Sequence, residues 1–220
     1  MKNSKNHTFN ETKATVRGFY NRVVKRFFDI SISFLGLLLL SWLMLIIVVI
    51  IFIDDPGPVF FKQDRIGKDK RHFNLYKFRS MKMSTPHDKP THLLENPEQY
   101  ITRCGRWIRK GSIDELPQLW NILRGDMSIV GPRPALWNQD DLIAERDKYG
   151  ANAVRPGLTG WAQINGRDEL DIPVKAKLDG EYVKRLNFGF DCKCFFGTVT
   201  AVVSHKGYVE GSAEKTEKSL

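Results

Sequence analysis

Two adjacent carboxylates, Asp114 and Glu115, stand in a stretch that is otherwise rich in apolar residues and arginines, GSIDELPQLWNILRGDMSIVGPRP. An aspartate can attack phosphorus as a covalent nucleophile. A neighbouring carboxylate can supply a ligand for Mg²⁺, which takes few protein ligands and binds phosphate oxygens. The pair therefore indicates phosphoryl chemistry, with Asp114 and Glu115 as candidate catalytic residues and candidate Mg²⁺ ligands.

Such chemistry needs cations, because a pyrophosphate is strongly charged and its transition state more so. Strand alternation places Lys77 and Arg79 on one face, and Arg109 precedes the acid pair in a basic stretch. Arg133 stands between two prolines, which restrict the backbone and suit bidentate capture of phosphate. Arg155, which opens a turn-rich segment, completes the candidate phosphate-binding set. The alternatives are a solvated strand edge for the first two and a packing role for Arg133.

The acid pair is expected at the N-terminus of a helix. Apolar residues recur at helical spacing from position 116 and Gly125 is a natural stop. Backbone N–H groups and the helix dipole would stabilise negative charge at that end. Ser112 followed by Glu115 also matches a capping box, which is a structural alternative for the glutamate. Pro117 favours a later helix start, because proline is tolerated best in the first turn.

Composition limits the class of protein. A chain of 220 residues suggests one domain with a real core. Lys and Arg number 34 against 25 Asp and Glu, so the surface should attract nucleic acid, anionic lipid or phosphorylated small molecules. Three cysteines fit neither a disulfide framework nor a zinc ribbon, which favours a reducing compartment.

A segment of 24 uncharged residues, 30–53, lies between Asp29 and Asp54. About 20 apolar residues suffice to cross a bilayer, so this segment predicts a membrane helix. It is too long for a secretory signal, and no small-residue cleavage site follows it. A buried core helix is the alternative.

Both flanks of this segment are basic, and basic flanks tend to stay in the cytoplasm. A helix that enters the membrane, bends near its middle and returns satisfies both flanks. Ser41 lies close to the midpoint, and a serine can bend a membrane helix by bonding to the carbonyl four residues earlier. Gly36 is a second candidate for the bend. An ordinary single span with one basic flank outside remains open.

The rest of the chain predicts an α+β fold. A β-hairpin is expected in residues 58–79, a short polar helix in 140–149, a tight hairpin turn at Asn165 and Gly166, and helices in 178–203 whose apolar face rests on the membrane or on a soluble core. The predicted organisation is a basic N-terminal extension (1–28), a helix-break-helix re-entrant membrane segment (29–54), a compact, mostly helical cytosolic or interfacial catalytic domain with a small β-hairpin (55–205) and a disordered tail (206–220).

Five ordered motifs, FFDISISFLGLLLLS, PGPVFFKQDRIG, FNLYKFRSM, SIDELPQLWNILRGDMSIVGPRP and RPGLTGWAQINGR, resemble those of the bacterial sugar transferases, in the short form of the monotopic phosphoglycosyl transferases. They cover about residues 22–203. The resemblance implies transfer of a sugar phosphate from a UDP-sugar to undecaprenyl phosphate with release of UMP, the first membrane step of bacterial glycoconjugate synthesis. It implies two steps through a phosphosugar-aspartyl intermediate on Asp114, with Glu115 handling Mg²⁺ or a proton. Lys77, Arg79 and Arg109 occupy basic positions of the family near the site, and Arg133 occupies one associated with phosphate or nucleotide.

The resemblance also implies a monotopic, re-entrant attachment to the bacterial inner (cytoplasmic) membrane, with lipid contacts and an active site facing the cytoplasm. It implies no nucleic-acid partner and leaves a homodimer open. Family members commonly have Ser-Pro at the helix break, whereas Trp42 follows Ser41 here. Without the proline no backbone hydrogen bond is necessarily lost, so the bend depends on other contacts.

Two alternatives stay open from the residues alone. A membrane-anchored basic protein that binds anionic lipid or nucleic acid without catalysis explains the net charge of +9 but not the acid pair, because carboxylates weaken polyanion binding. Direct attack by the lipid phosphate, without a covalent intermediate, is a second route for the reaction. The sequence specifies neither the sugar nor the pathway.

Overall fold

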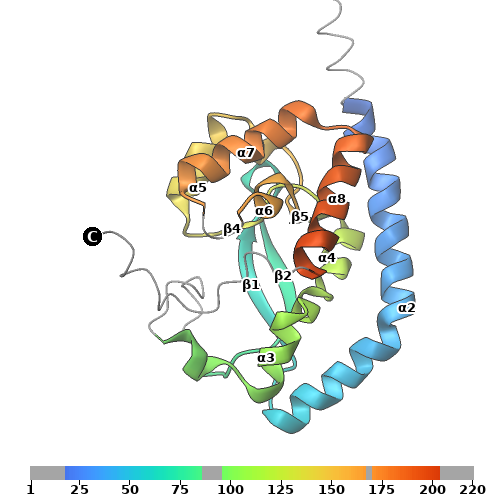
Figure 1. Ribbon diagram of the computed structural model, residues 1–220, viewed down its shortest axis with the longest axis vertical. Helices are drawn as coiled ribbons and strands as arrows, with labels where there is room; N and C mark the ends of the chain where they lie inside the picture. The colour runs from blue at the N-terminus through green and yellow to red at the C-terminus, as the bar shows by residue number, and fades with distance from the viewer. Residues whose placement is uncertain (1–17, 86–95, 167–169, 204–220) are drawn as a thin grey trace, which may run out of the picture.

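The computed structural model describes residues 18–85, 96–166 and 170–203. The predicted tail and most of the predicted N-terminal extension lie outside these ranges. The chain is α+β, with helices around short strands, as predicted (Figure 1). Its α-helices and strands are α2 (Lys25–Asp54), β1 (Phe60–Ile66), β2 (His72–Phe78), α3 (Arg103–Lys110), α4 (Gln118–Arg124), β3 (Ser128–Val130), β4 (Ala135–Leu136), α5 (Asp140–Asp147), β5 (Gly157–Thr159), α6 (Trp161–Ile164), α7 (Ile172–Arg185) and α8 (Phe188–Val203).

The predicted hairpin is confirmed. Strands β1 and β2 pair antiparallel from Phe60 opposite Phe78 to Ile66 opposite His72. The turn between them contains Asp69 at φ 54°, in the left-handed region that short polar residues tolerate best. Strand β4 adds two residues to the free edge of β1, which gives the order β2-β1-β4. This addition was not predicted, because a two-residue strand carries no periodic signal.

The hairpin predicted at Asn165 and Gly166 is wrong. The residues before this turn form helix α6, and Asn165 is its C-terminal cap. Strand β5 pairs instead in parallel with β3. The backbones approach so closely that a Cβ on Gly157 would lie 2.1 Å from Gly131 N. Only glycine fits here. Gly131 and Gly157 therefore allow two chain segments to approach each other closely, rather than forming a turn.

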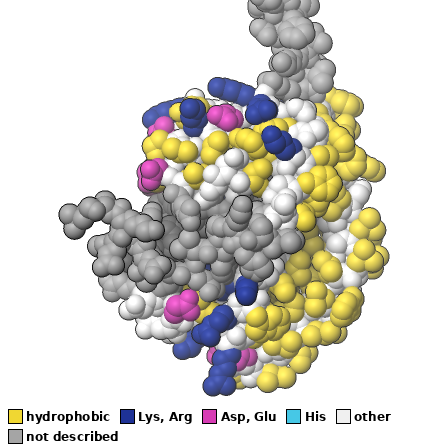
Figure 2. All heavy atoms as spheres, in the orientation of Figure 1, with side chains coloured by type: hydrophobic (Ala, Val, Ile, Leu, Met, Phe, Trp, Pro, Cys, Tyr) yellow, Lys and Arg dark blue, Asp and Glu magenta, His cyan; other side chains and the backbone are white. Residues whose placement is uncertain are grey.

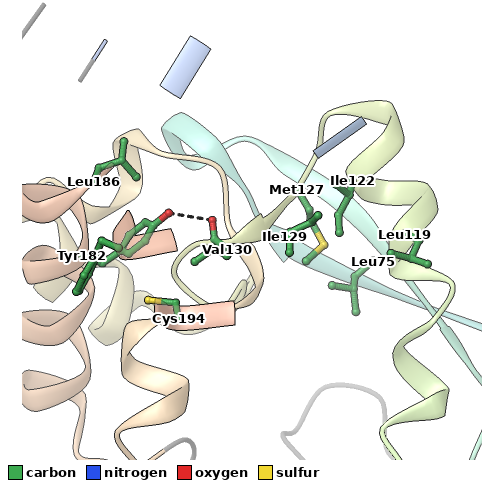
Figure 3. Close-up of a cluster of buried hydrophobic side chains, with 10 residues drawn as sticks. Leu75, Leu119, Ile122, Met127, Ile129, Val130, Tyr182, Leu186 and Cys194 are labelled. Atoms are coloured by element: carbon green, nitrogen blue, oxygen red, sulfur yellow. Dashed lines mark hydrogen bonds between the residues drawn. The ribbon is translucent and has the colours of Figure 1, made fainter. Parts of the chain in front are cut away.

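The predicted C-terminal helices are confirmed as α7 and α8, and the short polar helix as α5. In the main core Tyr182 lies among apolar side chains from β2, α4, β3 and α8, and its hydroxyl donates to Val130 O at 3.0 Å (Figure 3). On α8, Phe190 and Cys194 face this core, while other apolar side chains are exposed: Phe188, Phe195, Phe196 and Val199. Helix α8 therefore has one apolar face on the core and one uncovered.

Helix α2 is not a core helix. Its 30 residues correspond to about 45 Å, and it follows one side of the molecule and bends near its middle (Figure 1). Only 11% of its most apolar stretch is buried. Hydrophobic side chains gather along this edge of the molecule (Figure 2). Such a long, uncovered apolar surface is unusual for a soluble protein and is typical of a membrane contact.

Both ends of α2 are fastened to the same domain. Lys25 Nζ lies 2.6 Å from Asp191 Oδ2 of α8, and Asp29 Oδ1 accepts from Ile129 N of β3 at 2.9 Å. At the other end, Asp54 Oδ2 accepts from Cys104 N of α3 at 2.9 Å. The helix begins at Lys25, before the predicted boundary at 29, and both Lys25 and Asp29 are buried.

The bend in α2 occurs within a continuous helix. Ser41 Oγ donates to Leu38 O at 2.8 Å, three residues back rather than the expected four. Gly36 has a packing role, because a Cβ there would lie 3.1 Å from Leu119 Cδ1 of α4. The two halves of α2 pack on different clusters, the second through Ile47 and Ile51. The helix therefore bends without a proline, and its halves before and after Ser41 each pack on the rest of the protein.

Candidate active site

The acid pair lies in a single 3₁₀ turn, Ile113–Glu115, directly before α4. Pro117 is the N-terminal cap of α4, so the helix starts late, as the proline predicts. Ser112 has φ 53° and makes no side-chain capping bond. The capping-box explanation for Glu115 is therefore wrong, and its side chain has other partners.

Those partners are two cations from distant parts of the chain. Lys77 Nζ of β2 lies 2.7 Å from Glu115 Oε1 and 3.9 Å from Asp114 Oδ2. Arg133 Nη2 lies 3.3 Å from the same Glu115 oxygen. Asp114 is 7% exposed. Folding thus assembles two carboxylates and two cations into one small, largely desolvated group.

The environment gives the two carboxylates opposite pKa shifts. Burial raises the pKa of Asp114 above its usual range, with Lys77, Arg109 and Arg133 opposing. Burial also acts on Glu115, but the charges and hydrogen bonds of Lys77 and Arg133 outweigh it and hold its pKa well below the usual range. Neighbouring groups whose pKa values are pushed apart are suited to different chemical roles. Glu115 therefore stays ionised, and Asp114 is the carboxylate whose protonation state changes more readily.

A fully buried amide positions Lys77. Asn121 Oδ1 accepts from Tyr76 N at 3.0 Å, and Asn121 Nδ2 donates to Asn74 O at 2.7 Å. These bonds join α4 to β2 on either side of Leu75. The strand that carries Lys77 is thereby held against the helix that follows the acid pair.

A buried ion pair positions Arg133. Arg146 Nη2 of α5 donates to the carbonyl of Arg133 at 2.9 Å and lies 2.7 Å from Asp179 Oδ2 of α7. Both partners of this pair are almost fully buried. With a proline on each side as well, the backbone of Arg133 has little freedom to lose when its guanidinium binds an anion.

The other predicted phosphate-binding arginines divide into two groups. Arg109 lies close enough to Asp114 to lower its pKa. Arg79 is buried at the end of α2, where it donates to Asp55 O. Arg155 Nε donates to Gly125 O at 2.9 Å, at the far end of α4. Strand β2 ends at Phe78, so Arg79 lies just beyond the strand that carries Lys77.

The acid pair borders the apolar helix. Ile113 and Leu116, which flank it, pack with the cluster that contains Ile47 and Ile51 of α2. Leu119, one turn later, touches α2 at Gly36. The turn that carries the two carboxylates therefore packs directly against α2.

Sequence reasoning missed the residues that hold the site together. They are polar side chains in apolar surroundings: Lys25, Asp29, Asn121, Arg146, Asp179 and Asp191. One signal was available, since Asn121 interrupts the apolar run LPQLWNIL. A polar residue on a predicted core face needs a hydrogen-bond partner. Arg146 lies 33 residues from Asp179 and Lys25 lies 166 residues from Asp191, so these pairs leave no local pattern.

The donor set can be compared with the needs of Mg²⁺. In the described part of the chain no three acidic, histidine or cysteine side chains converge on one point. Mg²⁺ commonly binds through one or two carboxylates plus substrate phosphates and water. Asp114 and Glu115 are two carboxylates of the kind that such a site uses.

A buried carboxylate pair surrounded by three cations, beside an exposed apolar helix, is an arrangement suited to phosphate esters at a membrane surface. The chain belongs to the bacterial sugar transferase family, whose pattern it matches over residues 20–205.

Individual relatives agree with this assignment. An uncharacterized sugar transferase, EpsL, of Bacillus subtilis (strain 168) is 42% identical over 185 residues, 84% of this chain and 90% of that protein. The undecaprenyl-phosphate glucose phosphotransferase of Komagataeibacter xylinus is 42% identical over 82% of this chain. The UDP-glucose:undecaprenyl-phosphate glucose-1-phosphate transferase of Escherichia coli (strain K12) is 38% identical over 88% of this chain. The chain spans only 36% and 42% of the latter two proteins.

Proposed function

We propose that this protein transfers a sugar 1-phosphate from a UDP-sugar to undecaprenyl phosphate and releases UMP. The observation that carries the proposal is the buried Asp114, next to a glutamate that Lys77 and Arg133 already neutralise. Support also comes from the names of the relatives in Komagataeibacter xylinus and Escherichia coli, which specify undecaprenyl phosphate as acceptor. A protein that only bound polyanions would gain nothing from a buried acid pair.

The reaction proceeds in two displacements. A carboxylate oxygen of Asp114 attacks the sugar-bearing phosphorus of the donor, an Asp–O–P bond forms, and the P–O bond to the uridine-bearing phosphate breaks with its electron pair leaving on UMP. A phosphate oxygen of the lipid then attacks the same phosphorus. The Asp–O–P bond breaks, the carboxylate returns, and the lipid carries the sugar diphosphate.

The other charged groups supply electrostatic stabilisation. Lys77 and Arg109 lie where they offset the negative charge that builds on the phosphoryl oxygens, and Arg133 offers a guanidinium for a second phosphate. Glu115 keeps Lys77 and Arg133 in place. Asp114 and Glu115 would hold Mg²⁺, which would supply further neutralisation of the diphosphate.

Attachment to the membrane follows the re-entrant pattern. Both ends of α2 bond to one domain through Lys25, Asp29 and Asp54, so a straight crossing would separate groups that are in contact. Phe28 of α2 stacks near Phe188 of α8 with ring centroids 5.2 Å apart, which extends the apolar surface onto α8. We assign the helix to the inner membrane with the site on the cytoplasmic side, where UDP-sugars are found.

A donor panel tests the function. Detergent-solubilised protein with Mg²⁺ and undecaprenyl phosphate should release UMP from at least one UDP-sugar. Asp114→Asn should abolish release, and Asp147→Asn, at an exposed ion pair on α5, should leave it unchanged. No release from any donor would refute the proposal.

Mass spectrometry tests the covalent step. Protein mixed with the active donor alone should gain the mass of one sugar phosphate, mapped to Asp114. Release of UMP that requires the lipid, with no adduct, would show direct attack by the lipid phosphate instead.

A further inference from the structure

Gln118, the first residue of α4, carries a polar group that the fold does not use. Its side chain is 2% exposed, and its Nε2 has no hydrogen-bond partner among the residues that the structure describes. A buried donor without an acceptor loses its bonds to water and gains nothing in return. The amide therefore weakens the fold unless something outside the described chain accepts from it.

Its neighbour on the same helix shows that this is not a general property of α4. Asn121, one turn later, is also fully buried, and its side chain bonds to Tyr76 N and Asn74 O. The same short helix thus contains one satisfied amide with a structural role and one unsatisfied amide. The unsatisfied amide is the one next to the acid pair.

The position of Gln118 connects it with the proposed chemistry. It follows Asp114 by four residues and Glu115 by three, where the chain passes from the 3₁₀ turn of the acid pair into α4. On the other side of the pair, Arg109 Nε is also buried without a partner within the described ranges, and the charge of Arg109 acts on Asp114. Two unused donors therefore flank the acid pair along the chain.

We propose that Gln118 Nε2 donates a hydrogen bond to an oxygen of the phosphoryl group that reacts at Asp114. The inference rests on the proposed function and names a further substrate-contacting residue of that site. A phosphoryl oxygen carries no proton and accepts hydrogen bonds. An unpaired N–H donor lacks such an acceptor.

This assignment has a kinetic signature, because the same phosphorus sits at Asp114 in both displacements. A donor aimed at its oxygens acts when UMP leaves and again when the lipid attacks. A contact with uridine would affect only the first half-reaction, and a contact with the lipid only the second.

The test is Gln118→Met, which keeps the length and approximate volume of the side chain and removes the amide. We expect the thermal midpoint at neutral pH to stay unchanged or to rise by a few degrees, because no protein bond is lost. Both half-reactions, measured separately as adduct formation and as adduct discharge by lipid, should slow by about 10- to 100-fold. Asn121→Leu is the matched control, and its satisfied amide should cost several degrees in the thermal midpoint.

Binding of UDP, which presents a phosphate without turnover, separates this inference from the proposed function. UDP should raise the thermal midpoint of the wild type more than that of Gln118→Met, since stabilisation follows affinity. That result supports the contact even if no donor yields an adduct. Equal UDP shifts in the two proteins, or none in either, would overturn it. So would a clear loss of stability in Gln118→Met, or slowing confined to one half-reaction.

Discussion

The ammonium of Lys77 lies 2.7 Å from a carboxylate oxygen of Glu115 and 3.9 Å from one of Asp114, although 38 residues separate Lys77 from Glu115. The lysine thus makes a full ion pair with one member of the acid pair and only approaches the other. Glu115 is held by Lys77 and Arg133, while Asp114 is buried and has no such partner at bonding distance among the residues that the structure describes. This asymmetry supports the proposal that Asp114 attacks phosphorus and that Glu115 has the supporting role.

Asp114→Asn should separate activity from stability. Burial raises the folded-state pKa of Asp114, so its charged form is disfavoured in the folded protein. The stability this group contributes is present below its unfolded pKa and is lost as pH rises through the raised folded value. We expect the variant to lose UMP release and adduct formation, and to melt at or above the wild-type temperature at pH 7.

The pH dependence of that comparison provides a check. The thermal midpoint of Asp114→Asn relative to wild type should be highest at neutral pH and should decrease as the pH falls through the raised folded-state pKa of Asp114 toward its unfolded value. A variant that melts lower at pH 7 would contradict the raised pKa.

Glu115→Gln should destabilise the protein as well as inactivate it. Glu115 has a depressed folded-state pKa, so its contribution is present above the unfolded value and is lost as pH falls through the folded one. Removing its charge leaves Lys77 and Arg133 without their counter-ion, at a cost of about 3 kcal/mol. Chemical unfolding at pH 7 measures it, and the difference from wild type should persist below pH 4.5. An unfolding free energy equal to wild type would contradict the ion-pair geometry.

Ser112 provides an independent test of the rejected capping box. A true capping serine loses about 1 kcal/mol on change to alanine. Since Ser112 makes no capping bond and has φ 53°, we expect Ser112→Ala to change the unfolding free energy by less than about 0.5 kcal/mol. Ser112→Gly should be stabilising by up to about 1 kcal/mol, because glycine adopts this conformation without strain. A loss in both variants would restore the capping interpretation.

The Lys25–Asp191 pair should control attachment of α2. Both side chains are under 10% exposed, so removing one charge leaves the other charge buried without its ion-pair partner. We expect Lys25→Met to cost about 3–5 kcal/mol of unfolding free energy. The matched control is Lys70→Met, whose pair with Asp147 is about half exposed and should matter little. Similar effects of the two changes would show that the buried pair does not anchor the helix.

Cysteine accessibility tests the re-entrant attachment. In a background without Cys104, Cys192 and Cys194, single cysteines at the exposed positions Phe19 and Met83 should react with an impermeant reagent from the same side of the membrane. A cysteine at Trp42, near the bend, should be shielded. Labelling of Phe19 and Met83 positions from opposite sides would establish a single span.

Local sequence patterns were enough for most of the secondary structure. Alternating residues around a Gly- and Lys-rich turn predicted β1 and β2, and the uncharged run of 24 residues predicted α2. They failed where two distant segments decide the outcome. Strand β5 pairs with β3, so the predicted hairpin at Asn165 did not form.

For the site, the sequence by itself determined which groups are present: a vicinal acid pair, basic residues before and after it, and an apolar helix. Hydrogen-bonding partners and burial depend on which surfaces meet in space, and no local pattern records them. The tertiary structure therefore decided that Lys77, Arg109 and Arg133 act on Asp114, while Arg79 bonds to Asp55 and Arg155 bonds to Gly125. It also decided that Glu115 is ion-paired rather than capping a helix, because folding brings β2 and the segment after β3 to the same turn.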